Sequence, residues 1–265
     1  MSVLWSCPAC GQGALGPGNC PVCLKGRKYV KLRRLDQHGA VPMVMIAADR
    51  TPRLAVPGFP GIESAMNGGF VPGSVTVVYG GAGVGKSTLM LRLVDRMTRV
   101  LPQPALYCST EQTPEHVKLT GYRAGVNESR MLIAYETYVE AIERLLTRQR
   151  FAVIDSLSNL VREEPIAVVT GRLVEMARAH GTALVLVLHE TKDGDYNAPR
   201  QVEHLVDCMV RLSEVEGNGI TAPIHSLYWT VIGKYRFGPI NRKARLQLDE
   251  HGVPFDPAVA TRESD

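Results

Sequence analysis

The sequence predicts an α/β fold with a doubly wound, mainly parallel sheet, preceded by a small cysteine-rich segment. Three observations lead to this expectation. Short apolar runs alternate with stretches of helical spacing, as in parallel α/β sheets. A glycine-rich loop joins one apolar run to the helix after it, and two C-x-x-C pairs precede the whole. The apolar runs are residues 75–79, 104–109, 151–156 and 183–188, and the helical stretches are 87–100 and 168–180.

The glycine-rich loop fits the pattern G-x-x-x-x-G-K-[ST] of a phosphate-binding loop. Its residues are Gly80, Gly81, Ala82, Gly83, Val84, Gly85, Lys86, Ser87 and Thr88. Backbone N–H groups of such a loop surround phosphate oxygens, and the following helix adds partial positive charge. Lys86 would reach the β- and γ-phosphates, and the Ser87 hydroxyl would bind Mg²⁺. We therefore expect ATP and Mg²⁺ as ligands. The alternative, a chance glycine-rich turn, is disfavoured by the flanking strand and helix.

The composition is that of an ordinary globular protein and sets few limits on partners. The chain has 265 residues, 45% of them apolar and 21% charged, with 30 basic against 26 acidic side chains. A net charge of +4 does not by itself indicate a nucleic-acid partner. No apolar run approaches the ~18 residues of a membrane span, and the N-terminus lacks the pattern of a signal peptide. We expect a cytoplasmic protein without a membrane partner.

Four cysteines near the N-terminus have the spacing of a zinc ribbon. They are Cys7, Cys10, Cys20 and Cys23. Two C-x-x-C turns can aim four sulfurs at one tetrahedral Zn²⁺, which would supply most of the folding energy of so short a segment. Reduced thiols or two disulfides in a flexible tail are the alternative, and disulfides are rare in the cytosol. Cys108 and Cys208 lie in apolar runs, and we expect buried thiols there.

Polar residues follow three of the predicted strands, at the edge where open α/β sheets bind ligands. Glu111 could polarise an attacking water, although a loop or capping acid is the simpler alternative. Asp155 ends an apolar strand and would serve the magnesium ion. His189 is either a phosphate sensor or a polar strand terminus.

Three basic segments are candidates for phosphate or nucleic-acid contacts. Residues 25–34 carry six Lys and Arg side chains and are either a nucleic-acid contact or a solvated linker. Residues 191–200 have the composition of a loop. Within it, Lys192 and Arg200 are basic and Tyr196 could stack on a base, so we expect DNA contacts there.

The third basic segment is Lys234-Tyr235-Arg236-Phe237-Gly238, after a late strand at 227–232. On a strand, Lys234 and Arg236 would share one face and could meet a phosphate. A basic surface hairpin is the alternative.

Taken together, these motifs resemble the bacterial RadA (Sms) family of RecA-superfamily ATPases. The likeness rests on the Cys₄ ribbon, the phosphate loop preceded by GGFVPGS, Glu111, Asp155, the segment His189-Glu190-Thr191-Lys192, and KYRFG. It implies a RecA-type fold and ATP hydrolysis with Glu111 as the residue that activates water. Lys234 and Arg236 match the family's KNRFG segment, whose cations reach the nucleotide of the adjacent subunit. Tyr235 replaces Asn there, and Glu190 stands where Val is usual.

The resemblance also implies partners and an assembly. We expect a homo-oligomer, a hexameric ring, that binds single-stranded and branched DNA and promotes branch migration, with a RecA-type recombinase as a further partner. The family continues into a Lon-protease-like domain, which we expect this chain, ending at Asp265, to lack. The expected domains are a zinc ribbon at 1–28, a basic linker or arm at 29–60, the ATPase core at 61–252 and a polar tail at 253–265.

Three other functions fit the same sequence. A replicative-type helicase or helicase loader would share the core. A non-motor RecA-like regulator would use ATP only to control assembly. A zinc-dependent adaptor with a vestigial ATPase is disfavoured because Lys86, Glu111 and Asp155 are all present.

Overall fold

The computed structural model describes residues 5–7, 13–14, 18–20, 33–34, 52–127, 130–160, 164–189, 200–214, 226–249 and 251–260. The chain divides into two compact units, Met1–Thr51 and Pro52–Asp265. In the first unit, β1 (Trp5–Ser6) lies between β2 (Gly13–Ala14) and β3 (Arg33–Arg34) and is antiparallel to both. Cys7 and Cys20 are buried, whereas Cys10 and Cys23 lie outside the described residues.

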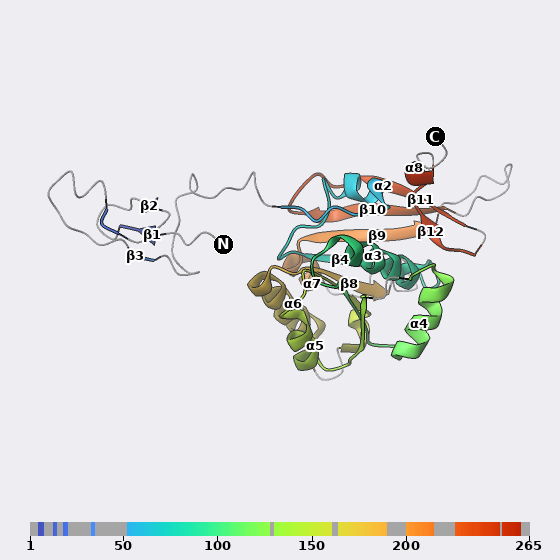
Figure 1. Ribbon diagram of the computed structural model, residues 1–265, viewed down its shortest axis with the longest axis horizontal. Coiled ribbons are helices and arrows are strands. Elements are labelled where there is room, and N and C mark those ends of the chain that lie inside the picture. Colours follow the sequence, from blue (N-terminus) through green and yellow to red (C-terminus); the bar gives the residue numbers. More distant parts are fainter. Residues whose placement is uncertain are drawn as a thin grey trace. The chain divides into compact units, whose positions relative to one another are not determined.

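The second unit is built on a nine-stranded sheet with the order β12-β11-β10-β9-β4-β8-β7-β5-β6 (Figure 1). Its parallel strands are β4 (Val75–Gly80), β5 (Leu106–Ser109), β6 (Leu132–Tyr135), β7 (Phe151–Asp155), β8 (Ala183–His189) and β9 (Cys208–Glu214). The antiparallel strands are β10 (Ser226–Tyr235), β11 (Lys243–Leu248) and β12 (Pro254–Phe255). The doubly wound, mainly parallel sheet that the sequence predicts is confirmed.

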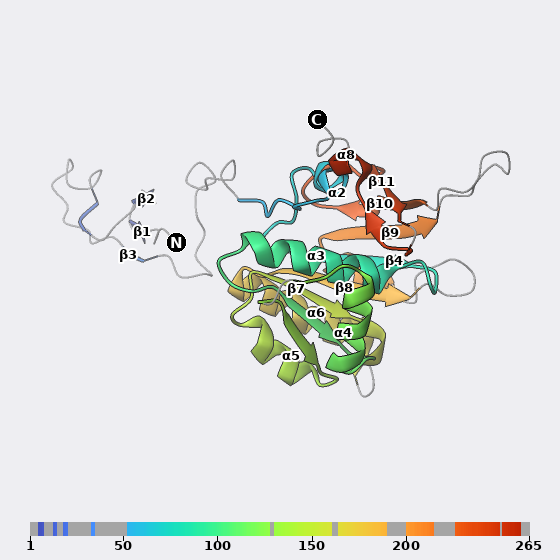
Figure 2. The same ribbon diagram turned by 45° about the vertical axis from the view of Figure 1, so that its right-hand side comes forward.

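Helices cover both faces of this sheet (Figures 1 and 2). One core contains side chains of α2 (Pro60–Ala65), α3 (Lys86–Val100) and α4 (Pro114–Arg123). The other contains side chains of α5 (Val139–Leu146), the 3₁₀ turn η3 (Leu157–Leu160), α6 (Ile166–His180) and residues on and next to α7 (Arg200–Leu205).

Alternation along β4 explains how one strand serves both layers. Val75, Val77 and Tyr79 face the α5–α6 side and Val78 faces α3. The strand is buried on both faces, which is why it reads as a continuous apolar run.

The core extends beyond the boundaries expected from sequence at both ends. Leu54 forms a β-bridge with Phe70, so the sheet-bearing unit includes residues before 61. At the other end β12 pairs with β11, and α8 (Pro257–Ala260) follows. The Asp256 carboxylate is 3% exposed and accepts a 2.6 Å hydrogen bond from the Gly61 backbone N–H. Residues 253–260 are therefore part of the fold rather than a polar tail.

Helix α6 ends as the sequence indicates, because Gly181 caps it with φ 66°. Cys108 and Cys208 are buried, as expected. None of the helices in the described parts of the chain is long and apolar enough to span a bilayer.

Candidate nucleotide-binding site

The loop between β4 and α3 has the backbone that a phosphate-binding loop requires. Gly85, the N-cap of α3, has φ 89°, a left-handed conformation that favours glycine. A Cβ added to Gly80 would lie 2.2 Å from the backbone oxygen of Leu212 in β9. Glycine at position 80 therefore allows β4 and β9 to approach each other where the loop begins.

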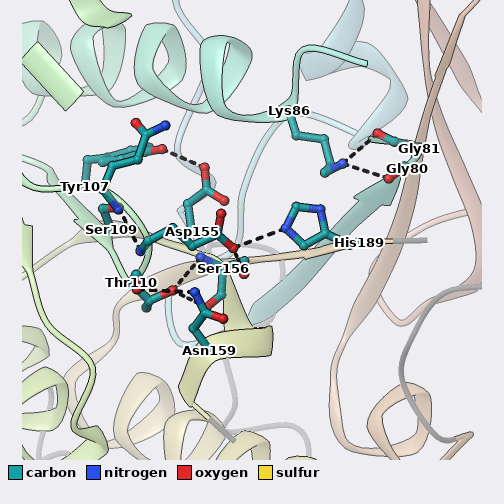
Figure 3. A network of polar contacts seen from close by, with 12 residues as sticks. Gly80, Gly81, Lys86, Tyr107, Ser109, Thr110, Asp155, Ser156, Asn159 and His189 are labelled. Atoms are coloured by element: carbon teal, nitrogen blue, oxygen red, sulfur yellow. Dashed lines mark hydrogen bonds and ion pairs between the residues drawn. The ribbon is translucent and has the colours of Figure 1, made fainter. Parts of the chain in front are cut away.

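Lys86 lies within this loop rather than in solvent. It is 5% exposed, and its Nζ donates hydrogen bonds to the carbonyls of Gly80 at 2.7 Å and Gly81 at 2.8 Å (Figure 3). The ammonium group is thus held beside the backbone that would surround phosphate, at the N-terminus of a 15-residue helix.

Strand register brings the other predicted residues to the same edge of the sheet. Gly80 pairs with His189 across β4 and β8, and Ser109 pairs with Asp155 across β5 and β7. All four stand at the carboxyl ends of parallel strands, where α/β sheets bind ligands. The hydroxyl of Tyr107 donates a 2.6 Å hydrogen bond to Oδ2 of Asp155, whose residue is 6% exposed.

Tyr107 is itself buried and stays protonated. Burial, followed by the charge and the hydrogen bond of Asp155, raises the pKa of Tyr107 well above its usual value. A protonated phenol is a hydrogen-bond donor, and Oδ2 of Asp155 is the acceptor.

Glu111 is held by two polar neighbours. Its Oε1 accepts a 2.6 Å hydrogen bond from the Ser156 hydroxyl and lies 3.2 Å from Nε2 of His189. Burial alone would raise the pKa of Glu111, but the hydrogen bonds from Ser156 and His189, with the charges of His189 and Lys86, lower it. The carboxyl group is therefore ionised at neutral pH and 40% exposed, so it can still reach water.

Further hydrogen bonds hold the backbone of Ser156 in place. Thr110 Oγ1 accepts from the Ser156 backbone N–H at 2.9 Å and donates to the Ser156 carbonyl at 2.8 Å. The Thr110 N–H also donates to the Asp155 carbonyl at 2.8 Å. Thr110, which follows β5, is thus bonded to Asp155 and Ser156 at the end of β7, as Figure 3 shows.

Sequence reasoning missed Tyr107, Thr110 and Ser156. A usable signal existed for Tyr107: a tyrosine in a buried strand needs a hydroxyl partner, and it stands two residues before Ser109 on the same face. Ser156 directly follows Asp155, but its bond to Glu111 depends on strand order, which the sequence does not state.

Lys234 and Arg236 lie away from the phosphate loop of their own chain. β10 runs antiparallel to β9, so Tyr235 pairs with Cys208, which in turn pairs with Thr76, four residues before Gly80. That separation is about 13 Å along the strand.

Both cations instead contact the end of α7. Lys234 Nζ donates to the carbonyls of Glu203 at 2.6 Å and His204 at 2.7 Å, and Arg236 Nη2 lies 3.4 Å from the His204 carbonyl. Arg236 Nη1 is 2.7 Å from Oδ1 of buried Asp207. Partial burial and the charge of Arg236 lower the pKa of Lys234.

The predicted DNA contacts fall mostly outside the described residues. Lys192 and Tyr196 lie outside the described residues, and Arg200 opens α7 with its side chain undescribed. Within the described ranges there is no group of three or more His, Cys, Asp or Glu side chains able to hold a metal ion. The predicted zinc set includes two undescribed cysteines and stays a prediction.

The fold and this site define a phosphate-loop nucleotide-binding protein. Residues 54–195, more than half of the chain, match the model of the AAA domain family. The chain therefore belongs to the AAA domain family.

Curated relatives are similar to most of this chain. The chain is similar to the DNA repair protein RadA of Mycobacterium tuberculosis (strain ATCC 25618 / H37Rv), with 32% identity over 228 residues, 81% of this chain and 46% of that protein. It is 29% identical over 272 residues to RadA of Listeria monocytogenes, 93% of this chain and 57% of the relative. It is 29% identical over 220 residues to RadA of Escherichia coli (strain K12), which covers 78% of this chain and 45% of that protein.

The resemblance to RadA that the motifs indicated is confirmed by these relatives. The chain spans about half the length of the curated relatives it matches.

Proposed function

We propose that this chain is an ATP-hydrolysing DNA motor of RadA type that acts in recombination and repair. The observation that carries the proposal is the single edge of the sheet at which Lys86, Asp155, Glu111 and His189 converge. Lys86 would bind the triphosphate, and Ser87 with Asp155 would hold Mg²⁺ through hydroxyl and carboxylate oxygens, the donors that this ion prefers. When bound, the ion would neutralise charge on the phosphates.

Glu111 is the proposed group that orients and activates water. It is ionised, exposed and directed by hydrogen bonds from Ser156 and His189. His189 stands level with Gly80 on the neighbouring strand, so a side chain that contacts the carboxylate also lies close to the proposed phosphate position. This arrangement supports His189 as the sensor that relates phosphate occupancy to the position of Glu111.

Lys234 and Arg236 are proposed to act on the nucleotide of an adjacent subunit. They lie far along the sheet from their own phosphate loop, and Arg236 is 43% exposed. A cation supplied across an interface can contribute about 10³–10⁵ in rate to phosphoryl transfer. Hydrolysis would therefore require a homo-oligomer, which we propose is a hexameric ring.

DNA binding is proposed for the loop at 191–200 and for the first unit. The loop leads directly into α7, whose last carbonyls accept hydrogen bonds from Lys234 and Arg236. A shift of the loop on single-stranded DNA would therefore reach both cations. For the first unit we propose a structural Zn²⁺ bound by Cys7, Cys10, Cys20 and Cys23, and branched DNA with a RecA-type recombinase as further partners.

ATP turnover with and without single-stranded DNA tests the proposal. Wild type should hydrolyse ATP faster with DNA. Lys86→Ala should lose nucleotide binding, whereas Glu111→Gln should keep it and lose about 100-fold or more in turnover. Lys118→Ala and Glu115→Gln, exposed changes on α4, are matched controls and should behave as wild type.

Three outcomes would contradict the proposal. Turnover that DNA does not affect would favour a regulatory ATPase. Full activity of Glu111→Gln would remove Glu111 from the mechanism. Strand displacement on forked DNA without a recombinase would favour a replicative-type helicase instead.

A further inference from the structure

The Tyr107 side chain contacts Asp155, one of the two groups proposed to hold Mg²⁺. The residue is 3% exposed, and its ring belongs to the core on the α3 face. Its hydroxyl donates a hydrogen bond to Oδ2 of Asp155 at 2.6 Å. Figure 3 shows the phenol and the carboxylate directed toward each other. A phenylalanine would fill the same core, so packing does not account for the hydroxyl.

The Tyr107 phenol is the donor in this hydrogen bond, and Oδ2 of Asp155 is the acceptor. The bond therefore fixes one of the two carboxylate oxygens of Asp155.

The hydrogen bond leaves the second oxygen of Asp155 available. Within the part of the chain that the structure describes, Oδ1 of Asp155 has no hydrogen-bond partner. A hydroxyl oxygen and a carboxylate oxygen are the hard donors that suit Mg²⁺, directly or through its waters. The residues present thus fit the ion.

We propose that Tyr107 is a positioning residue for a divalent cation, because it fixes Asp155 through Oδ2 and leaves Oδ1 available to the ion. The inference rests on the proposed nucleotide-binding function and adds a residue to it. Tyr107 does not touch the ion. It acts through Asp155, as outer-shell hydrogen bonds do at other metal sites, where their loss typically costs about 10–100-fold in metal affinity.

The test is a Mg²⁺ titration of fluorescent ADP binding to the full chain. In Tyr107→Phe the half-saturating Mg²⁺ concentration should rise about tenfold or more, while ADP affinity without Mg²⁺ stays within about twofold of wild type. Tyr228→Phe is the matched control. Tyr228 lies in β10 with Lys243 Nζ 5.5 Å from its ring centroid, a contact that does not need the hydroxyl, and Mg²⁺ dependence should not change.

A second measurement follows the resonance of Tyr107 itself in the wild-type protein. In wild type labelled with ¹³C at tyrosine Cζ, Mn²⁺ added with ADP should broaden one tyrosine resonance first, and that resonance should be missing in Tyr107→Phe.

The results distinguish a failure of the proposed function from a failure of the role assigned to Tyr107. If ADP binding to wild type ignores Mg²⁺, the proposed function fails, and this inference fails with it. If wild type depends on Mg²⁺ and Tyr107→Phe titrates identically, only the role of Tyr107 is refuted. The same holds if Tyr107→Phe weakens ADP equally with and without Mg²⁺, or if no tyrosine resonance is broadened.

Discussion

Replacing Gly80 by alanine should destabilise the protein at the start of the phosphate loop. The new Cβ would lie 2.2 Å from the Leu212 carbonyl oxygen and 3.2 Å from Val84 Cγ1. The oxygen is backbone in β9, and β9 is held by β4 on one side and by β10 on the other. It cannot rotate away, so one strand must shift.

The expected cost is that of forcing a methyl group into a filled space, about 1–3 kcal/mol. For a domain of this size, each kcal/mol lowers the melting temperature by about 2–4 °C. Gly80→Ala should therefore melt about 2–12 °C below wild type. Because the shift displaces the carbonyl that Lys86 contacts, ATP affinity should fall as well.

Gly171→Ala is a control of opposite sign. Gly171 lies inside α6, and a Cβ there meets nothing within 4 Å. Alanine should stabilise this helix by about 0.5–1 kcal/mol. Differential scanning calorimetry of both variants checks the reasoning. A Gly80→Ala protein that melts at or above the wild-type temperature would refute it.

Three further predictions follow from the site. Asp207→Asn removes the charge that pairs with Arg236 at 2.7 Å. Because Arg236 is 43% exposed, the free energy of unfolding should fall by about 1–2 kcal/mol, and DNA-stimulated turnover should fall with it. If melting temperature and turnover are both unchanged, Asp207 does not hold Arg236 in place. The pKa of Glu111 is lowered from its usual value of 4.5. Its hydrogen bonds therefore stabilise the native protein above about pH 4.5, and this contribution is lost as the pH falls through the lower native pKa. An NMR titration of the Glu111 carboxyl with a midpoint above about 4.5 would contradict this. Burial raises the pKa of Cys108 to about 12. Iodoacetamide at about pH 8 should therefore leave this thiol unmodified in the native protein. Rapid labelling of Cys108, detected by peptide mapping, would contradict this and show that β5 opens.

The parallel part of the sheet was predictable because its signals are local. Each buried strand is a short apolar run, and the glycine loop fixes where one strand ends and its helix begins. Asp155 and His189 could be placed at the ligand edge because parallel strands end together. The distances that make this edge a site could not be predicted.

The missed features depend on contacts between distant residues. Tyr107 reaches Asp155 only because β5 pairs with β7, and the sequence does not state this order. Asp256 lies in a segment that the sequence predicts to be a polar tail. It is buried, and its carboxylate accepts a hydrogen bond from the backbone N–H of Gly61, 195 residues away. The carbonyls of α7 that receive Lys234 and Arg236 carry no sequence signal, since every residue has one.

Mixing two inactive variants tests the proposed action between subunits most directly. Lys86→Ala lacks a working phosphate loop but keeps its cations, and Arg236→Ala keeps the loop but lacks one cation. Each should be inactive alone, and ATP turnover with DNA should return when they are mixed, because mixed interfaces join a sound loop to a sound Arg236. If Arg236→Ala alone hydrolyses ATP at the wild-type rate, or if mixing restores nothing, the cations do not act across subunits.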